Sequence, residues 1–69
     1  MSERVYKLTE IVGTSNGSIE NAIEVALERA KKSLRNIRWF EIVTTRGYAH
    51  PDRGIEYQVT LKVGFQLEG

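Results

Sequence analysis

Residues 55–67, IEYQVTLKVGFQL, alternate apolar and polar side chains over their whole length. Successive side chains of a β-strand point to opposite faces of the sheet, so this period of two predicts a strand with one apolar and one polar face. The apolar face would carry Ile55, Tyr57, Val59, Leu61, Val63, Phe65 and Leu67. The polar face would carry Glu56, Gln58, Thr60, Lys62, Gly64 and Gln66. The apolar face needs another element of the chain to cover it.

Residues 19–36 are expected to form the covering helix, because apolar side chains recur there at spacings of three and four. These positions are Ile19, Ala22, Ile23, Ala26, Leu27, Ala30 and Leu34. The preceding segment GTSNG, residues 13–17, has turn chemistry that ends the strand before it. Ser18 is placed to cap the helix by accepting a hydrogen bond from a free backbone amide.

Two more strands are expected, at residues 4–12 (RVYKLTEIV) and at residues 37–48. The segment YAHPDRG, residues 48–54, reverses the chain through Pro51, Asp52 and Gly54. His50, the only histidine, is expected to be a solvent-exposed residue of this turn, because it has no partner for metal binding or base catalysis.

The order strand, helix, strand, strand restricts the topology. A helical crossover returns the second strand parallel to the first, and the short turn makes the third strand antiparallel to the second. With the third strand in the centre, every neighbouring pair is antiparallel. The sequence therefore predicts one α+β domain over residues 1–69, a β-α-β-β subunit with a three-stranded antiparallel sheet wrapped around one helix.

One helix can cover only one face of this sheet, so the face with Gln58 has no cover within the chain. The second strand has apolar side chains on both sides. One side carries Phe40 and Ile42 with Arg38, Thr44 and Arg46, and the other carries Trp39 with Ile37, Glu41, Val43 and Thr45. We assign Phe40 and Ile42 to the helix side, which turns Trp39 to the uncovered face, although the pattern alone also permits the reverse assignment.

Two interpretations of an indole on that face remain open. Trp39 can anchor a contact between subunits, since tryptophan is enriched at such contacts. It can instead be a stacking platform for a flat aromatic ligand, whose polar edge the Gln58 amide would read and whose anionic tail Arg46 and Arg38 would hold.

The composition limits the function classes. A chain of 69 residues forms a small core, and without cysteine or a second histidine it has neither disulfides nor a tetrahedral metal site to stabilise it. Association with other copies is the remaining means of stabilisation. A net charge of +1 gives no general attraction to nucleic acid or membrane, and no apolar run is long enough for a membrane span or a secretory signal. We expect a cytoplasmic protein.

Three segments together make a recognisable signature: IVGTS at residues 11–15, RWFEIVTTRG at residues 38–47 and YQVTLKVGFQLE at residues 57–68. The chain resembles the dodecins, a family of small flavin-binding proteins, from about Val5 to its end. The resemblance implies a hollow homododecamer of β-α-β-β subunits, built from trimers. It also implies flavins bound as antiparallel pairs between subunits.

The resemblance implies a role for each candidate residue. Trp39 would stack on the isoalloxazine ring, Gln58 would hydrogen-bond its pyrimidine edge, and Arg46 would meet the phosphate of FMN. FMN is therefore the first choice of ligand, with riboflavin, FAD and lumichrome as alternatives. Thr44 stands where several dodecins have a carboxylate near the ribityl chain. Gln66 replaces an arginine that is associated with coenzyme A binding in many bacterial dodecins, so coenzyme A is not implied here.

A flavin pressed between an indole and a second flavin leaves no space for a substrate. We therefore expect flavin storage, sequestration and protection from photochemistry, with no catalytic residues and no metal. The alternative is a structural oligomeric module without a ligand. A nucleic-acid binder is disfavoured, because few aromatic residues are interleaved with basic ones.

Overall fold

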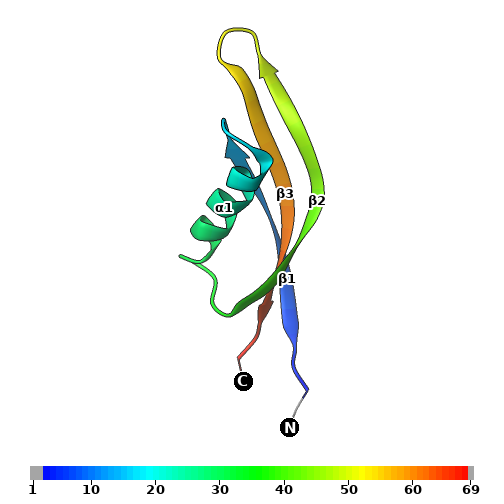
Figure 1. Ribbon diagram of the computed structural model, residues 1–69. Helices are drawn as coiled ribbons and strands as arrows, with labels where there is room; N and C mark the ends of the chain where they lie inside the picture. Colours follow the sequence, from blue (N-terminus) through cyan, green and yellow to red (C-terminus); the bar gives the residue numbers. More distant parts are fainter. Residues whose placement is uncertain (1–2, 69) are drawn as a thin grey trace.

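The computed structural model describes residues 3–68 and contains one helix packed on one face of a three-stranded sheet (Figure 1). The elements in chain order are β1 (Tyr6–Ser15), α1 (Ile19–Ala30), β2 (Ile37–His50) and β3 (Gly54–Gln66). The strand order is β1-β3-β2, and β3 pairs antiparallel with both neighbours. The predicted α+β fold with β3 in the centre is therefore confirmed.

The largest differences from the predicted boundaries are at the end of β1 and at the end of α1. β1 continues through the glycine-rich segment because Thr14 and Ser15 still pair with β3. The helix ends at Ala30 and not at residue 36, because the N–H groups of Lys32 and Ser33 bond to carbonyls three residues back, at 3.1 Å each. Asn36 then has a φ of 61°, a left-handed conformation that cannot continue the helix.

The start of the helix agrees with the prediction. The Ser18 hydroxyl oxygen accepts a hydrogen bond from the backbone N–H of Asn21 at 2.9 Å. Ser18 itself has an extended backbone, as expected of an N-cap residue.

The core lies between α1 and the middle of β3. Among the described residues its buried apolar side chains are Ala22, Ala26, Ala30, Val59, Leu61 and Val63. The buried side chains of the helix are all alanines, with Ile23 and Leu27 packed beside them as partly buried residues, so the helix backbone lies close to the sheet. Gly13 of β1 permits this approach, because a Cβ there would lie 2.7 Å from the Cβ of Ala26 and closer still to the carbonyl oxygen of Ala22.

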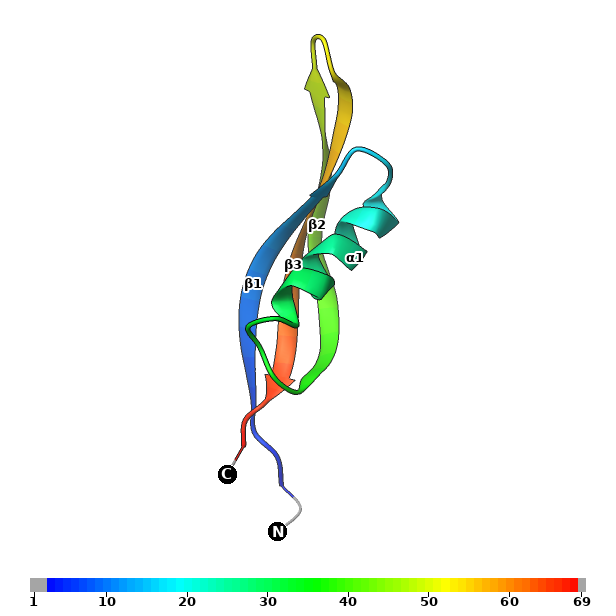
Figure 2. The same cartoon turned by 90° about the vertical axis from the view of Figure 1, so that its left-hand side faces the viewer.

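The helix covers β1 and β3 and leaves β2 largely open. It packs against the other two strands and lies in front of the sheet in Figure 2. Phe40 opposes Val63 and Ile42 opposes Leu61, so both lie on the helix side as predicted. They nevertheless remain exposed, at 41% and 51%, because no helix residue reaches over them.

The β2–β3 hairpin extends well beyond the helix (Figure 1). The molecule is accordingly elongated, with principal extents of 55 × 20 × 14 Å, and both chain ends lie opposite the hairpin turn. Within residues 3–68, no helix has the length and apolar character needed to cross a membrane.

His50 is not the exposed loop residue that we expected. It is the last residue of β2, its side chain is only 12% exposed, and its ring stacks on Tyr48 with centroids 4.6 Å apart. Nε2 lies 2.9 Å from the Glu56 carboxylate and Nδ1 lies 3.0 Å from the Arg53 guanidinium. Because a guanidinium can only donate, Nδ1 must accept and Nε2–H must donate to Glu56. The ring thus links the two strands at the end of the hairpin.

Replacing Gly13 by alanine tests the close approach of helix and sheet. We expect Gly13→Ala to lower the free energy of unfolding by about 1–3 kcal/mol or more, because the added methyl group pushes α1 away from β1. Gly17→Ala is the control, since the nearest atom to its new Cβ would be Ser15 Oγ at 3.5 Å. Denaturation midpoints at one protein concentration measure the difference, and equal midpoints for both variants would contradict the packing described.

Removing the His50 ring tests the hairpin contact. His50→Ala should raise the rate of amide hydrogen exchange across residues 48–56, with a cost of about 1 kcal/mol for the lost hydrogen bonds. Asp52→Ala, at an exposed position of the same turn, is the matched control. If both variants exchange at the wild-type rate, the histidine does not hold the hairpin.

Candidate functional site

The pairing of β2 with β3 shifts register twice, between Ile37 and Trp39 and between Ile42 and Thr44. Each shift is a β-bulge, which adds one unpaired residue and reverses the phase of the side chains beyond it. Ile37 opposes Phe65 and packs against the core, whereas Trp39 opposes Gly64 on the other face. The prediction that Trp39 faces away from the helix is therefore confirmed. Its grouping with Ile37 is wrong.

The second bulge changes the face on which Thr44 and Arg46 lie, so the predicted side of these two residues is wrong. Strict alternation placed Thr44 and Arg46 on the side of Phe40 and Ile42. In the structure Thr44 opposes Thr60 and Arg46 opposes Gln58, and these partners belong to the face away from α1. The two bulges thus bring Trp39, Thr44 and Arg46 to the same face, which we call the open face.

The open face is a sheet surface of three strands. β1 contributes Tyr6, Leu8, Glu10, Val12 and Thr14. β3 contributes Glu56, Gln58, Thr60, Lys62, Gly64 and Gln66. β2 contributes Trp39, Glu41, Thr44, Arg46 and Tyr48. Every predicted site residue on a paired position lies on this one surface.

Aromatic side chains mark one end of the open face. The Trp39 indole lies over Gly64, and its ring meets the Tyr6 ring at a centroid distance of 5.0 Å and an interplanar angle of 72°. Trp39 is still 37% exposed, so part of its ring is available for another molecule. We call Tyr6, Trp39 and Gly64 the aromatic end.

Arg38 also belongs to this end. It is the unpaired residue of the first bulge, and its Nε donates a hydrogen bond to Gln66 Oε1 at 3.2 Å. The guanidinium therefore lies beside the aromatic end and far along the sheet from Arg46, so the prediction that both arginines hold one anionic tail does not hold within one chain.

The other predicted residues form a polar end. Arg46 and Gln58 are direct cross-strand neighbours, and Thr44 lies one step nearer the middle of the sheet. Their side chains supply a cation, an amide with donors and acceptors, and a hydroxyl group. We call Thr44, Arg46 and Gln58 the polar end.

The two ends are far apart within one chain. Gln58 and Gly64, which lies under Trp39, are six residues apart on β3, or about 20 Å at a strand rise of about 3.3 Å per residue. One flat ring stacked face to face on Trp39 cannot also reach Gln58 of the same chain. The sequence pattern did not reveal this separation, because it does not show that Trp39 of β2 stands beside Gly64 of β3.

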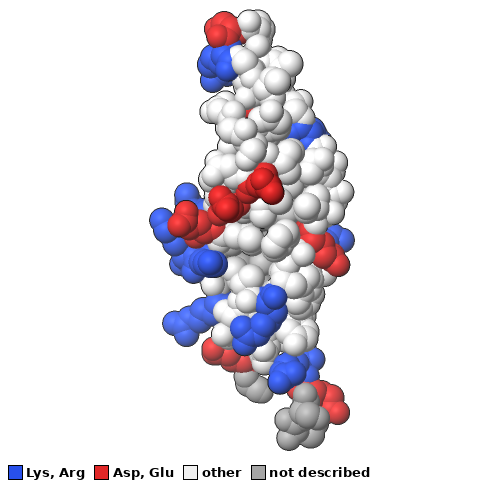
Figure 3. Space-filling view, in the orientation of Figure 1, with Lys and Arg blue, Asp and Glu red and all other residues white. Residues whose placement is uncertain are grey.

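Charges of both signs separate the two ends. Lys62 of β3 is in register with Glu10 of β1 and with Glu41 of β2. Elsewhere, charged side chains gather over the helix and the end of the molecule near the chain termini, and the β2–β3 arm is mostly uncharged up to its turn (Figure 3).

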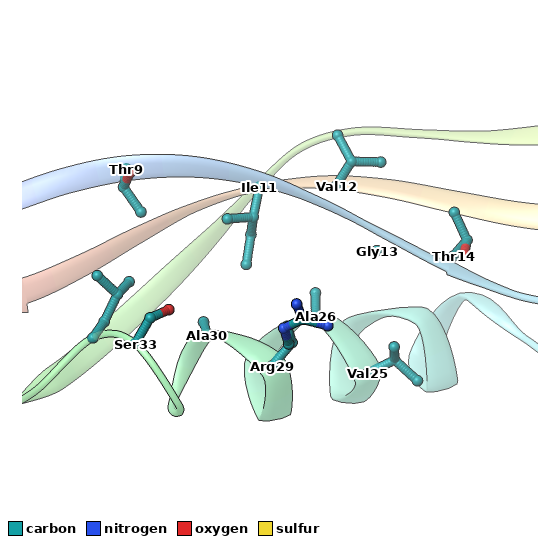
Figure 4. Close-up of a pocket in the computed structure, with 11 residues that line it drawn as sticks. Thr9, Ile11, Val12, Gly13, Thr14, Val25, Ala26, Arg29, Ala30 and Ser33 are labelled. Carbon is teal, nitrogen blue, oxygen red and sulfur yellow. The ribbon is translucent and has the colours of Figure 1, made fainter.

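The structure also has a groove that is not on the open face. It has a volume of about 500 Å³ and lies between β1 and α1 (Figure 4). Its walls are mainly apolar, with Ile11, Val25 and Ala26 among them, and Arg29 is its only charged residue. None of the predicted site residues lines it. Residues 3–68 also contain no group of three or more His, Cys, Asp or Glu that could hold a metal ion.

Comparisons with known proteins agree on one family. The family model for Dodecin matches residues 5–68. Dodecin from Thermus thermophilus is 51% identical over 65 residues, which cover 94% of each chain, and calcium dodecin from Mycobacterium tuberculosis is 33% identical over 63 residues, which cover 91% of this chain and 89% of that one.

Solved structures agree with the sequence comparison. The structure of dodecin from Streptomyces davaonensis matches with a TM-score of 0.92 at 41% identity. The match covers 99% of this chain and 100% of that chain. A crystal structure from Thermus thermophilus has a TM-score of 0.90 at 49% identity, with coverage of 97% and 98%. A shared fold, a matching family model and half-identical sequence over nearly the whole length lead to one conclusion: this chain belongs to the dodecin family.

Proposed function

We propose that this protein binds FMN at junctions between its subunits, stores it and quenches its photochemistry. The observation that carries the proposal is the lone indole of Trp39, held on a sheet face that the chain itself leaves uncovered. An exposed indole ring offers a flat, electron-rich surface for an isoalloxazine ring, and contact between the two provides a route for quenching of the excited flavin. Membership in the dodecin family supports the same ligand class.

The polar end supplies the complementary contacts. The amide of Gln58 can donate to and accept from the pyrimidine edge of the flavin, and the Arg46 guanidinium can bind a phosphate. Thr44 lies beside them and offers a hydroxyl group to the ribityl chain. Arg38, which is near Trp39, would meet the ligand from the other end of the face. FMN is preferred to riboflavin and lumichrome, which lack a phosphate, and to FAD, which carries a second ring system.

The separation of the two ends requires at least two copies of the chain for one flavin. Trp39 of one copy and Gln58 of another would contact the same ring. Self-association also fits the small core, in which only Leu61, Val59 and Val63, of the residues that the structure describes, are large, fully buried side chains. We propose that the assembly is the homododecamer of the family, in which copies cover one another's open sheet surface.

The proposed role is binding without turnover. A flavin enzyme needs a space for its substrate beside the reactive ring and groups that transfer protons there. A ring that is stacked on Trp39 and on a second flavin would lack both. Oxidation of a reductant by the FMN-loaded protein should therefore be no faster than by free FMN.

Titration with FMN tests the proposed function directly. We expect flavin fluorescence to fall on addition of the wild-type protein and to recover in Trp39→Ala, which removes the stacking surface and should weaken binding at least about fivefold. Riboflavin, FAD and lumichrome, titrated in parallel, rank the ligands. Light scattering should give the same assembly mass for both proteins. Unquenched FMN with a fully assembled wild-type protein would leave a structural oligomeric module as the function.

Mixed assemblies test whether one ring contacts two copies. Trp39→Ala and Gln58→Ala are each expected to bind FMN poorly when assembled alone. When the two variants are refolded together, some junctions combine an intact Trp39 with an intact Gln58 from different chains, so the mixture should recover part of the quenching. If both residues acted from one chain, the mixture would never exceed the average of the two separate variants.

A further inference from the structure

Gly64 lies directly under the indole of Trp39. A Cβ added at Gly64 would lie 2.6 Å from Cη2 of Trp39 and closer still to Cε2 and Cζ2. These are three consecutive atoms of the six-membered ring, so the Cα–H of Gly64 points at the face of the ring and not at its edge. The indole therefore lies flat against the backbone of β3, on a position that is itself buried.

Tyr6 of β1 contacts the indole across β3, the strand that separates β1 from β2. β1 pairs Leu8 with Gly64, and Tyr6 is one step further along the same face. Its ring meets the indole at 72°, an edge-to-face arrangement that aromatic pairs favour. The contact with Gly64 comes from β3 and the contact with Tyr6 comes from β1, while the indole itself belongs to β2. All three strands thus fix one orientation of one side chain.

We propose that Gly64 is the positioning residue of the flavin site. It holds the Trp39 ring flat, so that the face of the indole turned away from Gly64 runs parallel to the sheet. This inference rests on the proposed function for its ligand, but the packing of the indole on Gly64 does not depend on it. A ring that lies flat offers its whole face to a planar ligand, whereas a tilted ring offers an edge. Tyr6 limits rotation of the ring about its χ angles, and Gly64 sets its height and tilt.

Gly64→Ala tests whether Gly64 positions the indole of Trp39. The methyl group would occupy the space of the indole, so Trp39 must tilt or leave its rotamer. We expect FMN affinity to fall about tenfold or more, with partial return of flavin fluorescence, and we expect a changed near-ultraviolet circular dichroism signal of Trp39 without any flavin. Gly47→Ala is the matched control, because Gly47 is also a strand glycine and its new Cβ would meet only Ile55 at 3.9 Å.

A second comparison, in the variant Trp39→Phe, shows whether Gly64→Ala acts through the indole or destabilises β3 in general. Phenylalanine at position 39 lacks the second ring that overlies Gly64, so Gly64→Ala should change the melting temperature of Trp39→Phe much less than that of the wild type. If Gly64→Ala alone fails to assemble and the double variant assembles, the clash with the indole is the cause, as proposed. An equal effect of Gly64→Ala in both backgrounds would overturn the inference.

The outcomes for the inference and for the proposed function are distinct. If the wild-type protein does not bind FMN, the proposed function is wrong. The circular dichroism and melting comparisons would still test whether Gly64 positions the indole. If the wild type quenches FMN and Gly64→Ala quenches it equally well, with the dichroism signal unchanged, the proposed function stands and the positioning role of Gly64 is refuted.

Discussion

A single short helix has to cover a sheet that is much longer than itself. α1 has 12 residues, about 18 Å at 1.5 Å per residue, whereas β2 has 14 residues and spans about 45 Å. The helix packs close to β1 and β3 through alanines and Gly13 and does not reach over β2. The hairpin arm follows from this difference in length, and the exposure of Phe40 and Ile42 follows from the position of the helix over β1 and β3. The open face remains because one helix covers only one side of the sheet.

The side chains of β2 alternate between the two faces in an order that a regular strand cannot produce. Ile37, Phe40 and Ile42 lie on the helix side, whereas Trp39, Thr44 and Arg46 lie on the open face. Regular alternation allows only one phase along a strand, so a change of phase requires an extra residue. The two bulges provide it, and the unpaired Arg38 of the first bulge is held by Gln66.

The open face is organised as two ends and not as one pocket. Its aromatic end fixes an indole on glycine and tyrosine, its polar end groups an amide, a guanidinium and a hydroxyl group, and charged residues separate them. In the proposed function the two ends are half-sites of one chain. The proposal thus joins ligand binding to assembly, because neighbouring copies would bring complementary half-sites together. The small core and the proposed binding role then depend on the same association.

The amino-acid sequence by itself determined the element order, the central position of β3, the helix cap at Ser18 and the family, because these follow from local periodicity, local hydrogen bonding and a specific signature. It also identified Trp39 as the residue that faces away from the helix. Only the tertiary structure decided where β2 changes phase, that His50 is bound by Glu56 and Arg53, and that Gly64 lies under the indole. Cross-strand register produces these features, and register depends on contacts between residues far apart in the chain. A period read along one strand cannot show which residue of the neighbouring strand stands beside it.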